Sequence, residues 1–98
     1  MEAVHVLFHV TARHDVDNCG MYSDERREAL QAFIPIVSSR CEELGVKLHF
    51  AVAAHPDHVF FFLVEADDLI SVCALLAEVP MKQEFDLKPV RAVSLNRP

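Results

Sequence analysis

The chain has 98 residues, of which 52% are hydrophobic and 24% are charged, and its formal net charge at pH 7 is −6. This length predicts one domain, residues 1–98, and the composition excludes disordered, collagen-like and linker-rich proteins. The acidic balance, without a cluster of Lys or Arg, argues against nucleic-acid binding and against docking on an anionic membrane. A small anionic ligand would need a local cation such as Arg13.

The N-terminal segment MEAVHVLFHV has an acidic second residue, no basic start and no small-residue cleavage site, so it predicts no secretion signal. Its apolar runs are too short to span a bilayer. The three cysteines, Cys19, Cys41 and Cys73, show neither a CxxC pair nor zinc-finger spacing. We therefore expect no disulfide framework and no structural zinc site, and a mature cytoplasmic protein with reduced thiols.

The first predicted element is a strand over residues 3–13, where side chains of two kinds alternate. One face would carry Val4, Val6, Phe8, Val10 and Ala12, and the other would carry His5, Leu7, His9, Thr11 and Arg13. After a loop over residues 14–22, Ser23 is expected to cap a helix that ends at Gly45. Pro35 lies inside this helix and should bend it, because proline removes a backbone donor.

Two more strands are predicted over residues 46–54 and 59–66, joined by the turn HPDH. In the earlier one, alternation places Val46, Leu48, Phe50 and Val52 on one face and Lys47, His49, Ala51 and Ala53 on the other. The later one, VFFFLVEA, is apolar on both faces, which is typical of a strand covered on both sides. A helix over residues 69–79, capped by Asp67 or Asp68, and a strand over residues 83–93 complete the chain. Pro89 fits that last strand only at a sheet edge or a bulge.

The order strand, helix, strand, strand, helix, strand predicts an α+β fold of the ferredoxin-like split βαβ type, with both helices on one face of an antiparallel sheet. In this topology strand three lies between strands one and two. The uncovered sheet face would carry Leu7, histidines and part of the Phe60 to Phe62 cluster, which is too apolar to face water in a monomer. We therefore expect a homodimer in which two such faces pack together.

The element order over nearly the whole chain, with the strands VHVLFHVTARH and EFDLKPVRAV, resembles the dimeric α+β barrel superfamily, which includes muconolactone isomerase, antibiotic-biosynthesis monooxygenases and YCII-related proteins. The loop HDVDNCG is similar to an H-x-x-E-N-C type signature of a small bacterial family in that superfamily. It departs from that signature because Asp17 stands in place of Glu and Gly20 in place of a following Pro. The resemblance implies a barrel of two facing sheets with a ligand or active-site cavity between them. It implies no single reaction, because the fold hosts isomerases, oxygenases, haem enzymes and decarboxylases.

The first candidate site is a set of histidines on the mixed sheet faces, His5, His9 and His49. The backbones of His9 and His49 would lie about two strand spacings apart, roughly 9 to 10 Å. These two residues are candidate acid/base groups or metal ligands, and Arg13, with Lys47, is a candidate to hold an anionic substrate. Alternatively, the histidines are polar residues that line a wet dimer interface.

The second candidate site is the polar loop after the first strand, which contains His14, Asp15, Asp17, Asn18 and Cys19. A position just before a helix N-terminus and near an imidazole favours the thiolate, so Cys19 is a candidate nucleophile or metal ligand, with His14 as base or co-ligand. Together with His9, these two residues form the predicted metal set, for zinc, copper, iron or nickel. Alternatively, the loop is a polar turn with Cys19 packed under the start of the helix.

The remaining candidates are expected to be structural. Cys41 and Cys73 fall on apolar helical stripes and are predicted to be in the core. His55 and His58 flank a proline turn and are predicted to be exposed, with chance metal binding as a lesser alternative. Glu65 is predicted to form a surface ion pair near its strand end, or to be an acid of raised pKa if it is buried.

Three functions follow from these candidates. The leading prediction is a small-molecule enzyme or ligand-binding protein with its cavity between the facing sheets of a homodimer. Its catalytic residues would be His9, His49, Arg13 and Cys19. A competing prediction is a metal-binding protein without turnover that uses His9, His14 and Cys19, and a third is a structural or regulatory dimerisation module.

Overall fold

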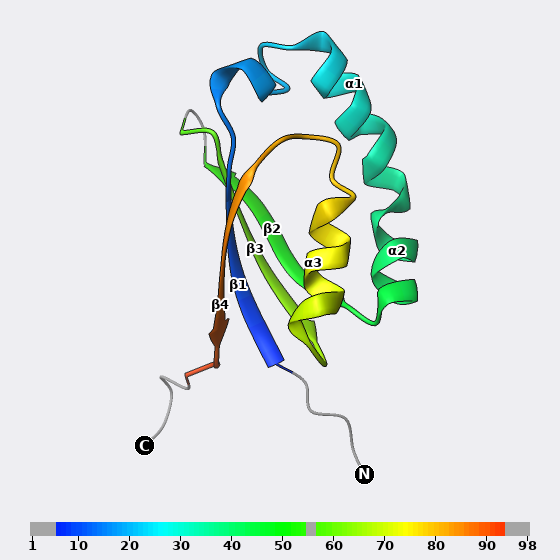
Figure 1. Ribbon diagram of the computed structural model, residues 1–98, viewed down its shortest axis with the longest axis vertical. Helices are drawn as coiled ribbons and strands as arrows, with labels where there is room; N and C mark the ends of the chain where they lie inside the picture. The colour runs from blue at the N-terminus through cyan, green and yellow to red at the C-terminus, as the bar shows by residue number, and fades with distance from the viewer. Residues whose placement is uncertain (1–5, 55–56, 94–98) are drawn as a thin grey trace.

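Four antiparallel strands form one sheet in a computed structural model that describes residues 6–54 and 57–93. The strands are β1 (Val6–Arg13), β2 (Lys47–Ala54), β3 (Val59–Ala66) and β4 (Glu84–Val90), and their order in the sheet is β2-β3-β1-β4. The helices all lie on one side of this sheet (Figure 1). The predicted α+β class with an antiparallel sheet is therefore confirmed, and β3 lies between β1 and β2 as expected. Pro89 is on the edge strand β4, also as predicted.

The helices begin and end where the local sequence signals place them. They are the short 3-10 turn η1 (Val16–Asn18), α1 (Asp24–Phe33), the 3-10 turn η2 (Ile34–Ile36), α2 (Val37–Leu44) and α3 (Leu69–Ala77). Ser23 and Asp68 cap α1 and α3, each accepting a backbone N–H of the first turn. Pro35 lies in η2 and so divides the predicted long helix into α1 and α2, because proline cannot donate to the helical ladder. Gly45 ends α2 in the left-handed region, with φ 70°.

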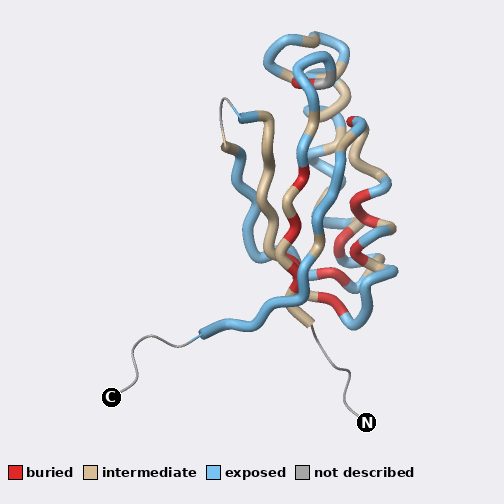
Figure 2. The backbone as a smooth tube through the Cα atoms, turned by 60° about the vertical axis from the view of Figure 1, so that its left-hand side comes forward, coloured by how far each residue is buried: buried red, intermediate tan, exposed pale blue. Residues whose placement is uncertain are grey.

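The hydrophobic core lies between the sheet and the helices α2 and α3. Its buried members are Phe8, Val10, Cys41, Val46, Val64, Ala66, Val72, Leu75 and Leu76. Figure 2 shows buried segments of the backbone in the sheet and in the helices beside it. The core prediction for Cys41 is confirmed, and burial raises the pKa of its thiol.

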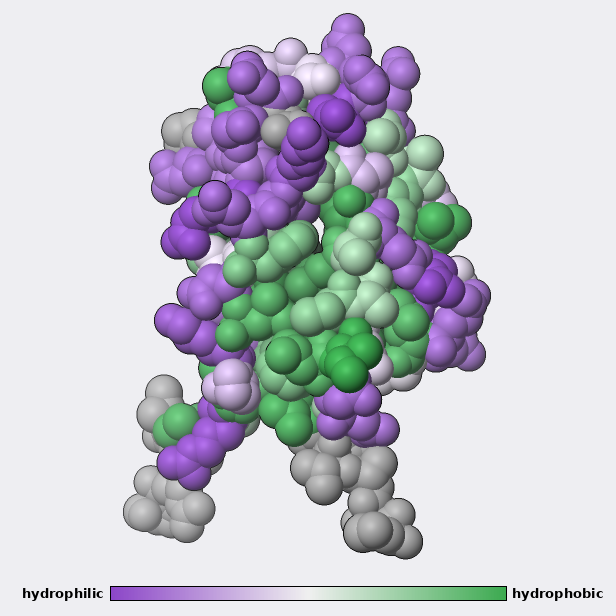
Figure 3. Space-filling view, viewed as in Figure 1, coloured by the Kyte–Doolittle hydropathy of each residue, from purple (hydrophilic) through white to green (hydrophobic). Residues whose placement is uncertain are grey.

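Helix α3 also carries apolar side chains on its outward side. Cys73 is exposed there, so its core prediction was wrong. The sequence of α3, LISVCALLA, is apolar all round, so an apolar stripe did not identify its inner side. Leu69 and Ile70 are exposed on it as well, and Figure 3 shows apolar side chains gathered where Figure 1 places α3 and β4.

An ion pair joins α2 to the end of α3. Arg40 donates from Nε to Oε1 of Glu78 at 2.7 Å and from Nη2 to Oε2 at 2.5 Å, a two-pronged contact. The hydrogen bond from Arg40 holds the pKa of Glu78 below its usual value. The pKa of Glu78 is thus lower in the folded state than in the unfolded state, where it is about 4.3. The ion pair therefore stabilises the fold fully at pH values above about 4.3, and this stabilisation is lost as the pH falls through the folded-state pKa.

We therefore expect Glu78→Gln to be less stable than the wild type near neutral pH, and the difference to shrink as the pH falls below about 4.3. Urea denaturation across a pH series measures this difference. Glu42→Gln, on the exposed side of α2, is the matched control and should show a small difference that changes little with pH. A difference for Glu78→Gln that stays constant into the acid range would contradict the linkage.

A β-bulge in β2 reverses the predicted faces of its second half. The register shifts at His49, after which Phe50 pairs with Leu63 and Val52 pairs with Phe61. Because successive side chains alternate across a strand, this pairing puts Phe50 and Val52 on the sheet face away from the helices, here called the open face. The alternation prediction was wrong from Phe50 onward, because one extra residue moves every later side chain to the opposite face.

The described part of the chain contains no helix whose length and hydropathy would let it cross a membrane. The first residues of the predicted first strand, including His5, and the turn residue His55 lie outside the described residues.

Candidate metal centre

Three segments of the chain bring a histidine, a cysteine and a second histidine together at one end of the sheet. His14 follows β1, Cys19 follows η1, and His58 precedes β3. The imidazole nitrogens and the cysteine Sγ that these residues offer as ligands all lie within 4.8 Å of one another. Zinc binds nitrogen at about 2.0 to 2.1 Å and sulfur at about 2.3 Å, so side-chain movements of about 1 Å would close the group onto one ion.

The two histidines are held by backbone and ring contacts. The backbone N–H of His14 donates to the carbonyl of His58 at 3.1 Å, which ties the exit of β1 to the β2–β3 hairpin. The two imidazoles meet edge to face with 5.3 Å between centroids, and the His14 ring stacks on Phe60 at 5.3 Å. His58 has φ 59°, in the left-handed region, where residues other than glycine are uncommon and persist when their surroundings fix them. The ring contacts of His58 with His14 and with Tyr22, whose centroid is 6.0 Å away, place its imidazole beside that of His14.

Cys19 is 4% exposed and sits in a tight turn that leads into α1. Its carbonyl accepts the backbone N–H groups of Tyr22 at 3.0 Å and Ser23 at 2.9 Å. The backbone N–H of Met21 donates to Sγ at 3.5 Å. These contacts orient the sulfur, as the outer hydrogen bonds of metal ligands do. The burial of Cys19 beside α1 agrees with the alternative interpretation, in which it packs under the helix start, and this position is compatible with a ligand role.

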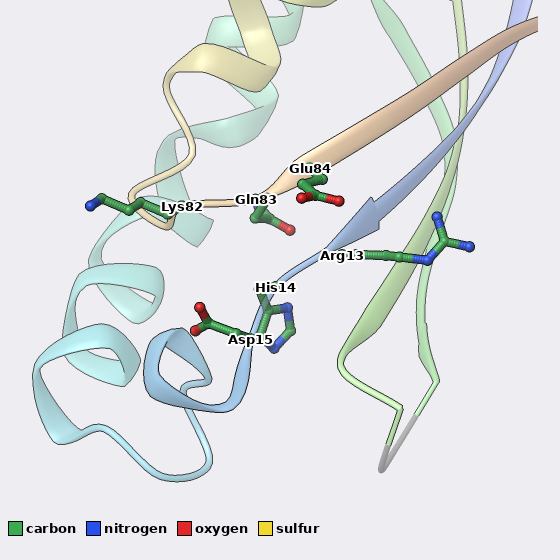
Figure 4. A pocket seen from close by; sticks show the side chains of 6 residues that line it. All are labelled: Arg13, His14, Asp15, Lys82, Gln83 and Glu84. Carbon is green, nitrogen blue, oxygen red and sulfur yellow. The ribbon is translucent and has the colours of Figure 1, made fainter.

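His14 stands between two pockets. A pocket of about 280 Å³ on one side is lined by His14, Cys19, Met21, Arg27, Leu30 and Phe60, with Gly20. A second pocket, of about 430 Å³, is lined by Arg13, His14, Asp15, Lys82, Gln83 and Glu84. In Figure 4, Arg13 and Lys82 extend away from this second pocket in opposite directions. The smaller pocket is therefore the one that borders two members of the candidate site, His14 and Cys19.

The structure places His9 apart from this group. His9 is on the open face of the sheet, where its ring lies 5.9 Å from that of Phe61. His14 instead follows the end of β1 and stacks on Phe60. Phe60 pairs with the buried residue Ala12, so His14 is on the helix side of the sheet. The described residues thus group His14 and Cys19 with His58. His58 is half-buried, so the prediction that it is exposed was wrong.

His49, the second predicted catalytic histidine, pairs with Glu65 across the sheet. Nε2 of His49 and Oε1 of Glu65 are 3.0 Å apart, and both side chains are partly exposed. Glu65 therefore has a side-chain partner near its strand end, and the predicted ion pair forms where His49 is protonated. Arg13 is exposed at the end of β1. The catalytic roles of His9, His49, Arg13 and Cys19 stay predictions.

The register of β1 and β3 is the signal that leads to His58. Arg13 pairs with Val59, so the next residue of one strand and the preceding residue of the other must lie side by side. The predicted topology places β3 beside β1 but specifies no register at the strand ends. Extending the β1–β3 register by one residue beyond Arg13 and Val59 places His58 beside His14.

No protein-family model and no curated protein matches this sequence. A solved structure from Bacteroides thetaiotaomicron, described as a conserved protein of unknown function and possible oxidoreductase, is similar to the chain with 11% sequence identity and a TM-score of 0.47. The similarity covers 91% of this chain and 100% of that chain.

Proposed function

We propose that the protein binds one transition-metal ion through His14, Cys19 and His58. The observation that carries this proposal is the convergence of two imidazoles and one thiol, from three separate segments, within 4.8 Å. Imidazole and thiolate ligands favour Zn²⁺ or Cu⁺ over Mg²⁺ and Ca²⁺, which prefer oxygen. Binding needs Cys19 to be reduced and to lose its proton to the solvent, and the proposed cytoplasmic location keeps thiols reduced.

Three protein ligands fit a catalytic type of site better than a closed structural one. Structural zinc sites commonly use four protein ligands, whereas catalytic sites use three and leave one position for water or substrate. The pocket beside His14 and Cys19 gives a small molecule access to that position. Metal-assisted chemistry on a small molecule is thus the proposed function, and metal binding without turnover is the alternative.

Titration of the chelator-treated protein with Zn²⁺, in competition with a chromophoric chelator, tests the metal site. We expect one equivalent per chain, and we expect Cys19→Ser and His58→Ala to weaken binding by about 100-fold or more, since even outer-shell changes cost 10- to 100-fold. Cys73→Ser, which removes an exposed thiol on α3, is the matched control and should bind as the wild type does.

His9→Ala separates this metal set from the one predicted from the sequence. We expect it to leave zinc affinity unchanged, because His9 is on the open face. A loss of zinc affinity as large as that of His58→Ala would indicate that His9 is a ligand. Absence of zinc binding by the wild type would refute the proposed function.

We also propose that the domain is ferredoxin-like and forms a homodimer of the dimeric α+β barrel type through its open face. The sheet order β2-β3-β1-β4 and the helices on one side support this topology. The bulge adds Phe50 and Val52, which are 42% and 52% exposed, to the apolar side chains Phe61 and Leu63 on the same face. An apolar patch of this kind with a polar rim is typical of an interface. The pair Asp86 and Lys88, 3.6 Å apart, and the pair His49 and Glu65 supply that rim.

A further inference from the structure

The smaller pocket beside the metal centre has apolar walls and one cation. Met21, Leu30 and Phe60 supply the apolar walls. Arg27 is the only Lys, Arg, Asp or Glu among the described residues that line it. Its volume, about 280 Å³, is slightly below the range of about 300 to 1,000 Å³ that is typical of pockets for drug-sized ligands. The pocket therefore fits a molecule smaller than a typical drug.

Arg27 is fixed at the side of this pocket by two contacts. Nη1 donates to the carbonyl of Gly20 at 2.9 Å, and Nη2 pairs with Asp24. The guanidinium carries five N–H donors and keeps its charge at all physiological pH values. These two contacts leave other N–H donors of the guanidinium, so an anion at this side of the pocket would share the Arg27 charge with the Asp24 carboxylate. The sequence pointed to Arg13 for this role, but the structure places Arg13 in the wall of the other pocket.

We propose that this pocket binds a small carboxylic acid with an apolar body. Its carboxylate pairs with Arg27, and its body packs against Leu30 and Phe60, beside the ion held by His14 and Cys19. An ionised carboxylate in an apolar pocket is costly unless a cation meets it, and the guanidinium matches its two oxygens. The inference rests on the proposed metal site and names the substrate class of that site.

Benzoate titration of the Co²⁺-loaded protein tests the inference, because Co²⁺ can replace zinc and its visible absorption reports changes around the ion. We expect benzoate to bind saturably and to shift the Co²⁺ spectrum. Benzamide has the same shape without the charge and should bind about 10-fold or more weakly, because it lacks the charge-assisted contact with the guanidinium. Calorimetry measures both affinities.

Two variants locate the bound benzoate. Arg27→Gln should weaken benzoate binding by about 10-fold or more while Co²⁺ affinity is retained. Arg26→Gln removes the same charge from the neighbouring residue, which does not line the pocket, and should change neither affinity. Leu30→Trp adds bulk to the apolar wall and should abolish benzoate binding while Co²⁺ still binds.

The two proposals fail in different ways. A protein that takes up no Co²⁺, or one whose spectrum lacks thiolate-to-cobalt absorption, contradicts the metal site before any benzoate is added. Normal Co²⁺ loading without a benzoate response overturns the pocket inference alone. So does equal binding of benzoate and benzamide, or benzoate affinity that is unchanged in Arg27→Gln or Leu30→Trp.

Discussion

Replacement of Phe8 by alanine is expected to lower the free energy of unfolding by about 3 to 5 kcal/mol, the usual cost of removing a buried phenylalanine. Phe8 is 7% exposed and belongs to the core cluster between the sheet and the helices. Its loss removes transfer free energy and leaves a cavity, since closely packed surroundings relax only in part. For a domain of this size each kcal/mol lowers the melting temperature by about 4 to 8 °C. Urea denaturation followed by circular dichroism measures the change.

Phe61→Ala is the matched comparison for Phe8→Ala. Both changes shorten a phenylalanine of the sheet, but Phe61 is on the open face and is only half-buried. We expect the Phe8→Ala loss to be the same at every protein concentration. The Phe61→Ala loss should depend on concentration, because the proposed homodimer would bury that side chain when two chains associate. A Phe8→Ala cost below about 1 kcal/mol would contradict the placement of the core.

Local signals predicted the elements because each signal acts within a few residues. Ser23 and Gly45 mark a helix start and end by their own hydrogen bonds and backbone angles. Pro35 interrupts its helix wherever the chain goes next. The faces of β1 were also predicted correctly, since Phe8 and Val10 are buried on the helix side. None of these features depends on a distant segment.

The bulge at His49 could not be read from the same kind of signal. The sequence KLHFAVAA alternates acceptably in either register, because small alanines follow the large residues. Its partner β3, VFFFLVEA, is apolar on both faces and therefore accepts Phe50 and Val52 on either side. The register is decided by pairing across the whole strand, and the faces of β2 change with it.

The candidate metal centre was half predictable for a related reason. His14 and Cys19 are near each other in the chain, and both are ligands predicted from the sequence. His58 joins them only through the antiparallel pairing of β1 with β3, which is a tertiary property. His9 was the nearer choice in sequence, but strand alternation puts it on the opposite face of the sheet.

Val52→Glu is expected to convert the proposed homodimer into a folded monomer. Val52 is 52% exposed on the edge strand β2, so a glutamate there is solvated in the single chain and should change its stability by about 0.5 kcal/mol or less. In a two-fold interface through the open face, the substitution introduces one charge from each chain into an apolar contact. Like charges juxtaposed in this way cost several kcal/mol, which weakens association by about 100-fold or more. Analytical ultracentrifugation over a concentration series measures the association.

Ile70→Glu provides the matched control, because it adds the same charge to an exposed apolar residue, 79% accessible, on the outward side of α3. We expect its mass to equal that of the wild type. If Ile70→Glu dissociates the dimer and Val52→Glu does not, the partner covers α3 instead. A wild type that is monomeric at every concentration removes the open-face interface altogether.

The same variant also tests the bulge. In the alternation predicted from the sequence, residue 52 would face the helices, and a buried glutamate there would unfold the domain rather than separate two copies. Circular dichroism of Val52→Glu distinguishes these outcomes: a native spectrum with a halved mass requires residue 52 on the open face. Because that placement depends on the register shift at His49, a single substitution tests the strand pairing and the surface for a partner together.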